Sequence, residues 1–322
     1  MDASPAGSDL VIGAGVIGSR VARMLAEGGH RVSVVSRRGA GLAGVTHVAA
    51  DAADGEAMAS LAEGADVIYN CVNPAYHRWP TDWPPIAASL LGAAERSGAV
   101  LVTLSNLYGY GPAERSLGVA AYDQAHPITE ATPLAATGRK GQVRARVWRD
   151  ALAAYQAGRV RVAEVRASDF IGPGAESALG ERVLGRLRQG KSVSVLGQAD
   201  RPHTWSFTDD VARMLVTAGT DPRAWGRAWH VPSDEPRSQR QVIDDFAQAA
   251  GVQVRVRTLP PALLHALGLV WPLMRELRET EYQFHGDFIM DSSAAQATFA
   301  LKPTPWEEIV EVTVRSRPGR TG

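Results

Sequence analysis

Three glycines near the N-terminus have the spacing of a loop that binds a dinucleotide. They lie between an apolar run, 10–12, and a helical pattern that stops at 28–29. Gly13 permits a tight turn, Gly15 lets the backbone approach a pyrophosphate, and Gly18 lets the helix pack against the strand. The free N–H groups at the helix N-terminus add a partial positive charge. The predicted phosphate loop consists of Gly13, Gly15, Val16, Ile17 and Gly18.

The end of the second predicted strand, 32–35, selects the nucleotide. Ser36, Arg37 and Arg38 follow it, and no carboxylate occurs before Asp51. An NAD site normally places an acidic residue here for the ribose hydroxyls, whereas an arginine accommodates the 2′-phosphate of NADP. A guanidinium binds a phosphate through two parallel hydrogen bonds. The sequence therefore favours NADP(H) over NAD(H); the alternative is a solvated basic turn.

The composition is that of a soluble globular enzyme, with 45% hydrophobic and 21% charged residues. The formal net charge is zero, so nothing favours nucleic acid or an anionic membrane as a partner. The single cysteine, Cys71, excludes an intrachain disulfide and is typical of a reducing cytoplasm. The first residues lack the features of a signal peptide, and the apolar segment 263–274 is too short to span a bilayer. We expect a cytoplasmic protein.

Strands alternate with helices through the first half of the chain. This order predicts βαβ units and a parallel sheet, which binds ligands beyond the carboxyl ends of its strands. From about Gly172 the elements become short and mixed, and Ser238 with Gln241 matches a capping box. We predict a Rossmann-type doubly wound α/β fold with a smaller, mixed substrate domain. The Rossmann domain is expected at 1–171 with segments near 204–235, and the substrate domain at 172–203 and 236–322.

Seven motifs occur in the order typical of extended short-chain dehydrogenases/reductases. They are the glycine motif 13–18, Asp51, Asn70-Cys-Val-Asn73, Ser105-Asn-Leu-Tyr108-Gly109, Thr129-Glu130-Ala-Thr-Pro133, the run 166–174, and Arg201 followed by 207–211. The chain resembles this superfamily over nearly its whole length, within the NAD(P)-dependent epimerase/dehydratase group. The resemblance implies a nicotinamide cofactor and a small-molecule substrate.

The resemblance also assigns cofactor contacts. Asp51 is similar to the residue that bonds the adenine amine, and Cys71, Val72 and Asn73 would line the nicotinamide ribose. Ser168 would lie along the nicotinamide. Two alternatives stay open, because Asp51 suits a turn or helix cap and Cys71 suits a small buried apolar position.

One departure from the family concerns the catalytic helix. The family places a tyrosine four residues before a lysine on the helix after the fifth strand, and this pair moves the proton and holds the ribose. In the usual register Thr137 and Gly141 occupy these positions here, and in the register shifted by one they are Ala136 and Lys140. Neither register keeps the tyrosine.

Three explanations of the chemistry follow. In the first, Tyr108 donates the proton, Lys140 anchors the ribose and Ser105 orients a carbonyl; Tyr110 and Tyr76 are the other tyrosines on the ligand side. In the second, Lys140 alone or a substrate group moves the proton. In the third, the protein binds NADP(H) without catalysis, as a sensor or scaffold. The first predicts an oxidoreductase acting on a small carbonyl or hydroxyl metabolite, as a reductase or in an epimerase/dehydratase reaction.

An aromatic segment after the fourth strand is predicted to be a loop at the substrate. Trp79 and Trp83, together with His77 and Arg78, could form a rim for a ring-shaped or acidic ligand, and Tyr76 of the same segment is also assigned to the substrate. The alternative is a loop that covers a sheet edge or a partner subunit. Arg201 resembles the substrate-binding arginine of sugar-nucleotide members of the family. No residues have metal-ligand spacing, so we expect no metal.

Two predicted helices, 85–96 and 139–157, suggest a homodimer. The second carries apolar residues at a spacing of four, namely Val143, Val147, Ala151 and Tyr155. Members of the resembled family pair these helices across a two-fold axis. The alternative is that the stripe faces only the protein's own sheet.

Overall fold

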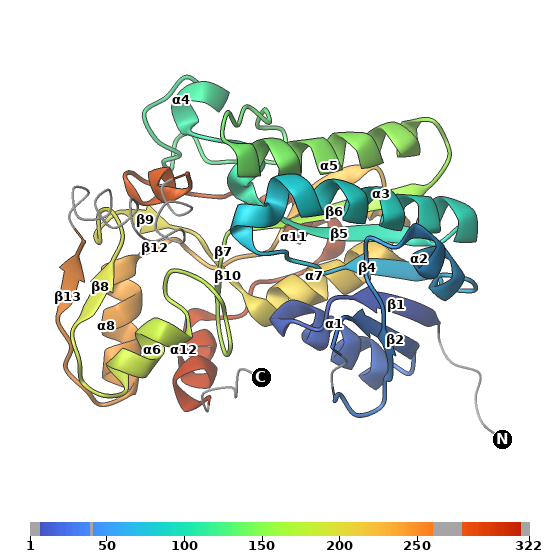
Figure 1. Ribbon diagram of the computed structural model, residues 1–322. Helices are drawn as coiled ribbons and strands as arrows, with labels where there is room; N and C mark the ends of the chain where they lie inside the picture. Colours follow the sequence, from blue (N-terminus) through green and yellow to red (C-terminus); the bar gives the residue numbers. More distant parts are fainter. Residues whose placement is uncertain (1–6, 39–40, 260–278, 317–322) are drawn as a thin grey trace. The chain divides into compact units, whose positions relative to one another are not determined.

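The computed structural model describes residues 7–38, 41–259 and 279–316 (Figure 1). The apolar segment predicted at 263–274 lies outside these residues. The chain forms two compact units, the first from 1–106, 139–166 and 211–229, and the second from 107–138, 167–210 and 230–322. This division differs from the predicted domains, because 107–138 and 167–171 group with the second unit.

The first unit contains a seven-stranded sheet in the order β3-β2-β1-β4-β5-β6-β11. Its strands are β1 (Ser8–Ile12), β2 (Arg31–Ser36), β3 (Thr46–Ala49), β4 (Val67–Asn70), β5 (Val100–Asn106), β6 (Arg161–Ala167) and β11 (Arg227–His230). The pairs β1–β2, β1–β4, β2–β3 and β4–β5 are parallel. The order reverses between β1 and β4, which is the switch point at which doubly wound sheets bind ligands. The predicted Rossmann-type fold is confirmed.

Helices cover both faces of this sheet. They are α1 (Val16–Glu27), α2 (Gly55–Leu61), α3 (Trp79–Ser97), α5 (Arg139–Gln156) and α7 (Thr208–Thr220). In Figure 1, α3 and α5 lie side by side above the sheet, and α1 and α7 lie below it. Every residue of β4 is buried, as expected for a parallel strand that is covered on both faces. None of the described helices is long and apolar enough to cross a bilayer.

Helix α3 begins earlier than the sequence pattern predicts. A short 3-10 turn, η1 (Tyr76–Arg78), leads directly into α3 at Trp79, so the loop predicted for this segment is wrong. Pro80 suits the first turn of a helix, whose N–H groups have no partners within the helix. Pro84 and Pro85 remove two further donors, and the burial of the Trp79 and Trp83 side chains offsets that loss.

In its described residues, the second unit combines short helices with three two-stranded sheets. Its strands are β7 (Asp169–Ile171), β8 (Val193–Val195), β9 (Pro202–His203), β10 (Trp205–Phe207), β12 (Arg237–Ser238) and β13 (Val256–Thr258). Its helices and 3-10 turns are η2 (Leu107–Gly109), α4 (Ala113–Ser116), α6 (Glu181–Leu187), α8 (Gln239–Ala249), η4 (Glu281–Phe284), α11 (Ser293–Phe299) and α12 (Trp306–Arg315). The predicted capping box is confirmed at the start of α8. The Gln241 backbone N–H donates to the Ser238 hydroxyl, and the Ser238 N–H donates to the Gln241 side chain at 2.8 Å.

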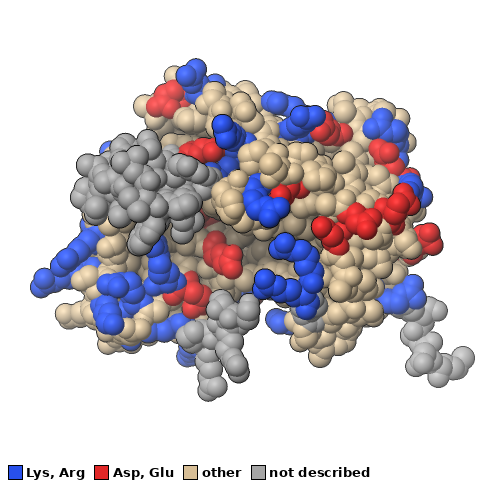
Figure 2. All heavy atoms as spheres, in the orientation of Figure 1, with Lys and Arg blue, Asp and Glu red and all other residues tan. Residues whose placement is uncertain are grey.

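Charged side chains are mixed on the visible surface. Figure 2 shows basic and acidic residues interspersed over the described part of this face. On this face the mixture of the two signs agrees with the formal net charge of zero.

Candidate cofactor and active site

The glycine loop forms where β1 leaves the sheet. Ile12 pairs with Val35 and Asn70 in the two neighbouring strands, so the three strands end level. Gly13 then turns with a φ of 103°, a conformation that favours glycine, and its N–H donates to the Val35 carbonyl at 2.8 Å. A side chain at Gly18 would collide with the Gly13 carbonyl, so α1 starts in direct contact with the loop.

The N-terminus of α1 has the features of a phosphate site. Gly15 is its N-cap residue and provides no side chain to cap the helix. Apart from Gly15 and its two chain neighbours, no described atom lies within 4 Å of the place where a Gly15 side chain would begin, so the space beside the first turn is open. The first turn also contains no acidic residue. Backbone N–H groups and the positive end of the helix dipole therefore face a space that fits a pyrophosphate.

The end of β2 offers donors to an anionic group. The Ser36 hydroxyl oxygen is buried and has no hydrogen-bond partner among the described residues. Buried hydroxyls are almost always satisfied, so this oxygen indicates a missing partner. The next two residues, Arg37 and Arg38, are exposed. One hydroxyl and two guanidinium groups fit a nucleotide phosphate.

The other predicted cofactor residues lie at the ends of β3 and β4. Asp51 is exposed, and its carboxylate accepts a hydrogen bond from the Ala53 N–H at 3.0 Å, so it stabilises a turn. Cys71 is 8% exposed and lies against Gly13 and Gly18. Burial raises the pKa of the Cys71 thiol to about 12, so it stays protonated and packs as a small apolar group. Val72 is half-buried and Asn73 is exposed.

The inner face of α5 carries two basic residues one turn apart. Lys140 is 2% exposed and Arg144 is 6% exposed. The Lys140 Nζ lies 5.9 Å from the centroid of the Tyr76 ring. Ala136 and Thr137 both precede α5, which starts at Arg139, so neither predicted register places two partners on this helix.

The two tryptophans of the aromatic segment face the interior. Trp79 is 1% exposed and Trp83 is 0% exposed, so their indoles form no open rim. The Trp79 Nε1–H donates to the Pro74 carbonyl at 2.9 Å, which fixes the turn before α3. Tyr76 is half-buried, and His77 and Arg78 of the same segment are exposed.

The remaining predicted site residues lie on β5 and in the second unit. Ser105 is 3% exposed near the carboxyl end of β5. Tyr108 is half-buried in η2, whereas Tyr110 is fully buried with its hydroxyl 2.8 Å from the His230 Nε2. The buried Ser168 hydroxyl has no hydrogen-bond partner among the described residues. Arg201 is exposed, and its guanidinium lies 3.6 Å from the Asp287 carboxylate.

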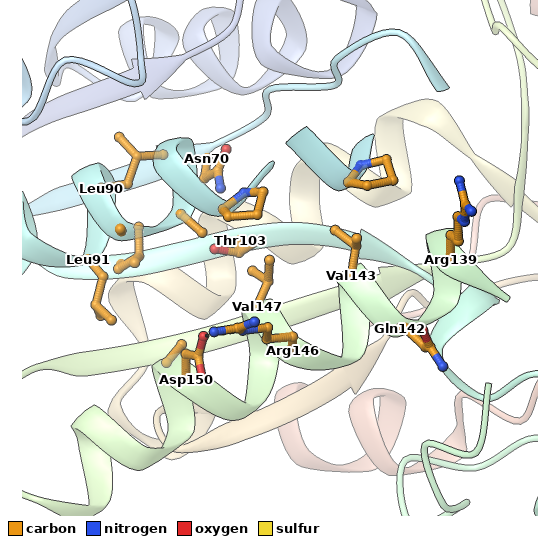
Figure 3. A pocket seen from close by; sticks show the side chains of 16 residues that line it. Asn70, Leu90, Leu91, Thr103, Arg139, Gln142, Val143, Arg146, Val147 and Asp150 are labelled. Carbon is orange, nitrogen blue, oxygen red and sulfur yellow. Dashed lines mark ion pairs between the residues drawn. The ribbon is translucent and has the colours of Figure 1, made fainter. Parts of the chain in front are cut away.

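The apolar stripe of α5 lines a groove and is not part of the buried face of the helix. Val143, Val147 and Ala151 are half-buried, and Tyr155 is 36% exposed. The first three border a groove of about 780 Å³ between α3 and α5, together with residues such as Pro84, Ala87, Ala88 and Leu91 (Figure 3). Arg146 and Asp150, 3.5 Å apart, lie at the same groove.

Sequence reasoning missed Arg144 in this site. It follows Lys140 by four residues, so the two share one helix face, and Trp148 continues that face. The predicted stripe at 143, 147 and 151 is displaced by one residue from the buried face. The spacing of four residues between 140, 144 and 148 could have indicated the buried face. Two of these three positions are basic, however, and a buried helix face is normally recognised by its apolar residues.

Comparison with known proteins identifies the family. The model of the NAD dependent epimerase/dehydratase family matches residues 10–231. The chain belongs to this family. It is therefore an enzyme of the nicotinamide-dependent oxidoreductase type, as the sequence resemblance predicted. None of the curated proteins matches the chain.

Several solved structures share the fold at low sequence identity. The dTDP-glucose 4,6-dehydratase from Bacillus anthracis in complex with NAD is 16% identical, with a TM-score of 0.77 and 96% of each chain covered. The UDP-glucose 4-epimerase from Thermotoga maritima with UDP-glucose is 17% identical, with a TM-score of 0.75 and coverage of 95% and 97%. The Bordetella bronchiseptica enzyme WbmH in complex with NAD+ is 17% identical, with a TM-score of 0.72 and coverage of 96% and 97%.

Proposed function

We propose that this protein is an NADP(H)-dependent oxidoreductase for a small carbonyl or hydroxyl metabolite, working as a reductase or in an epimerase/dehydratase reaction. The observation that carries the proposal is the glycine loop at the end of β1, where the first turn of α1 contains no acidic residue and faces open space. Such a helix N-terminus binds a phosphate group. Lys140 lies buried at the start of α5, and we assign it to the ribose hydroxyls of the cofactor.

The nucleotide is assigned to the first unit. The backbone of the glycine loop would bind the pyrophosphate, and Ser36, Arg37 and Arg38 would bind the 2′-phosphate. Asp51 would face the adenine with its second carboxylate oxygen. The nicotinamide end would be bordered by 71–73, and Ser168 stays a predicted contact of the nicotinamide.

The proposed chemistry uses three residues of this chain. The nicotinamide supplies or accepts the hydride when bound. Lys140 holds the ribose hydroxyls and stabilises negative charge on the reacting oxygen, Tyr108 donates the proton, and Ser105 orients the carbonyl by a hydrogen bond. Tyr76 and Arg201 would contact the substrate, and Trp79 and Trp83 would support that wall from behind. The sugar nucleotides of the solved structures are not assigned to this chain, because its catalytic helix departs from the family pattern.

The alternative is a non-catalytic NADP(H)-binding sensor or scaffold. Ala136 and Thr137, which stand where the two registers place the catalytic tyrosine, favour this alternative. In either case the single cysteine suits a reducing cytoplasm.

We also propose that the protein is a homodimer that pairs α3 and α5 with the same helices of a second copy. The groove between them is largely apolar, and each copy offers both a basic and an acidic residue, Arg146 and Asp150. An isologous contact lets such a pair exchange partners across the two-fold axis.

The nucleotide assignment predicts that NADPH binds more tightly than NADH. Arg37→Glu places a carboxylate beside the 2′-phosphate and should weaken NADPH binding by about tenfold or more, with little effect on NADH. Fluorescence titration with both nucleotides measures this. Arg23→Glu, an exposed change on α1, is the matched control and should alter neither affinity. Preference for NADH in the wild type, or an unchanged NADPH affinity in Arg37→Glu, would contradict the assignment.

The catalytic assignment predicts turnover of NADPH with a member of a panel of small aldehydes and ketones. Tyr108→Phe should lower kcat by about a hundredfold because the proton donor is lost, and should leave NADPH affinity nearly intact. Steady-state kinetics and nucleotide titration check the two parts. Full activity in Tyr108→Phe would remove Tyr108 from the mechanism. NADPH binding without turnover of any member of the panel would favour the sensor alternative.

The dimer assignment predicts a mass of twice 34.3 kDa at micromolar concentration in light scattering. Val147→Asp places a charge in the apolar groove and should shift the protein to a monomer. Ala153→Asp, an exposed change on the same helix outside the groove, should leave the dimer intact. A monomeric mass for the wild type would refute the assignment.

A further inference from the structure

The guanidinium of Arg144 connects three elements of the first unit. Its Cζ lies 5.1 Å from the centroid of the Trp79 ring and 4.3 Å from that of the Trp83 ring, both on α3. Its Nη2 donates a hydrogen bond of 3.0 Å to the Leu104 carbonyl on β5. Arg144 itself belongs to α5. One buried side chain therefore joins α3, α5 and β5.

The contacts of Arg144 are of the kinds that offset the burial of a guanidinium. A desolvated cation–π contact contributes about 2 kcal/mol or more. A second buried basic residue, Lys140, lies one turn away on the same helix face. Two buried basic residues therefore share one face of α5.

The contacts of Arg144 lead back to Lys140. Trp79, which faces Arg144, also packs edge-on against Tyr76, with ring centroids 5.0 Å apart and an interplanar angle of 85°. The Tyr76 ring in turn lies 5.9 Å from the Lys140 Nζ. Contacts between neighbouring side chains thus run from Arg144 through Trp79 and Tyr76 to Lys140. The turn of α5 between Lys140 and Arg144 closes this circuit of contacts.

The hydrogen bond of Arg144 also connects it with Ser105. The Leu104 carbonyl that accepts the Arg144 hydrogen bond belongs to the residue directly before Ser105. Holding this carbonyl fixes the peptide from which the Ser105 side chain extends. A planar guanidinium is suited to both tasks, because it stacks on aromatic faces and donates in its own plane, which an ammonium cannot do.

We propose that Arg144 is the positioning residue of the candidate active site. It fixes Trp79 and thereby Tyr76, so that the Lys140 ammonium is held against the Tyr76 ring, and it anchors β5 at Ser105. This inference rests on the proposed function for the roles of Lys140 and Ser105. The circuit of contacts can be tested without a substrate.

The chain has three lysines, Lys140, Lys191 and Lys302, so lysine labelled with an isotope at the ε-carbon gives a simple spectrum. The Lys140 signal, assigned by its loss in Lys140→Arg, should be displaced from the other two by the ring current of Tyr76. In Arg144→Met it should move towards the signals of the exposed Lys191 and Lys302, which should not change. A folded Arg144→Met protein with an unmoved Lys140 signal would overturn the proposal.

Arg159→Met is the matched control. Arg159 also connects the region after α5 with α3, through a 2.9 Å ion pair to Glu95, but it is 55% exposed and lies beyond the other end of α5. An exposed pair contributes at most about 1 kcal/mol. The Lys140 signal should stay in place in this variant, and an equal shift in both variants would overturn a specific role for Arg144.

Two further measurements separate this inference from the proposed function. If Arg144→Met does not fold, Tyr76→Leu tests the same circuit at a half-buried position and should abolish the displacement of the Lys140 signal. No change there would overturn the inference. NADPH titration of Arg144→Met should show about tenfold weaker binding. A shifted Lys140 signal with unchanged NADPH affinity would support the positioning role and would contradict the cofactor role of Lys140.

Discussion

The site depends on the close contact among Gly13, Gly18 and Cys71 at the switch point of the sheet. The ends of β1 and β4 are level, and their next residues leave the sheet side by side. A side chain at Gly13 would lie 2.8 Å from the Cys71 carbonyl, and one at Gly18 would collide with Gly13. This contact sets where α1 begins, and therefore where its free N–H groups point. Larger residues at these three positions would move the phosphate site away from the strand ends.

A second constraint is the burial of cations on α5. The first unit places Lys140 and Arg144 on one face of a helix, and it compensates Arg144 with two indole rings and a carbonyl. Trp79 and Trp83 lie one helical turn apart, so both indole rings reach the Arg144 guanidinium, with their ring planes at 87° to each other. This contact favours a helix in the aromatic segment after β4. The segment forms a support for the site, in which Trp79 and Trp83 are buried, Tyr76 is half-buried, and His77 and Arg78 are exposed.

The first half of the fold could be predicted because local patterns determine it. Apolar strands, the glycine spacing and the alternation of strands with helices all indicate a Rossmann-type sheet, and family membership agrees. The start of α3 could not be predicted, because prolines and aromatic residues are typical of loops. The contact of Trp79 and Trp83 with Arg144, 61 residues beyond Trp83 in sequence, is one of the tertiary contacts that stabilise a helix there.

Some parts of the candidate site follow from a short run of sequence, and these could be proposed without a structure. Other parts depend on two residues that share a buried face, and these could not. The glycine loop and the Ser36–Arg38 run needed no tertiary information. Arg144, the second basic residue on the same face of α5 as Lys140, could be found only with tertiary information. The reason is that the buried face of α5 depends on how the helix packs against α3 and β5. The sequence comparison sought a tyrosine before Lys140, whereas the structure shows an arginine after it. Residue types one turn apart are therefore informative only when the buried face is known.

The most direct measurement is a crystal structure of the protein with NADPH bound. We expect the pyrophosphate at the N-terminus of α1, the 2′-phosphate at Arg37 or Arg38, and the Lys140 ammonium within about 3 Å of a nicotinamide ribose hydroxyl. We also expect a hydroxyl or ammonium group facing the nicotinamide C4. A nicotinamide that is bound elsewhere, or a C4 that faces only apolar atoms and bulk water, would contradict the proposed cofactor site and chemistry.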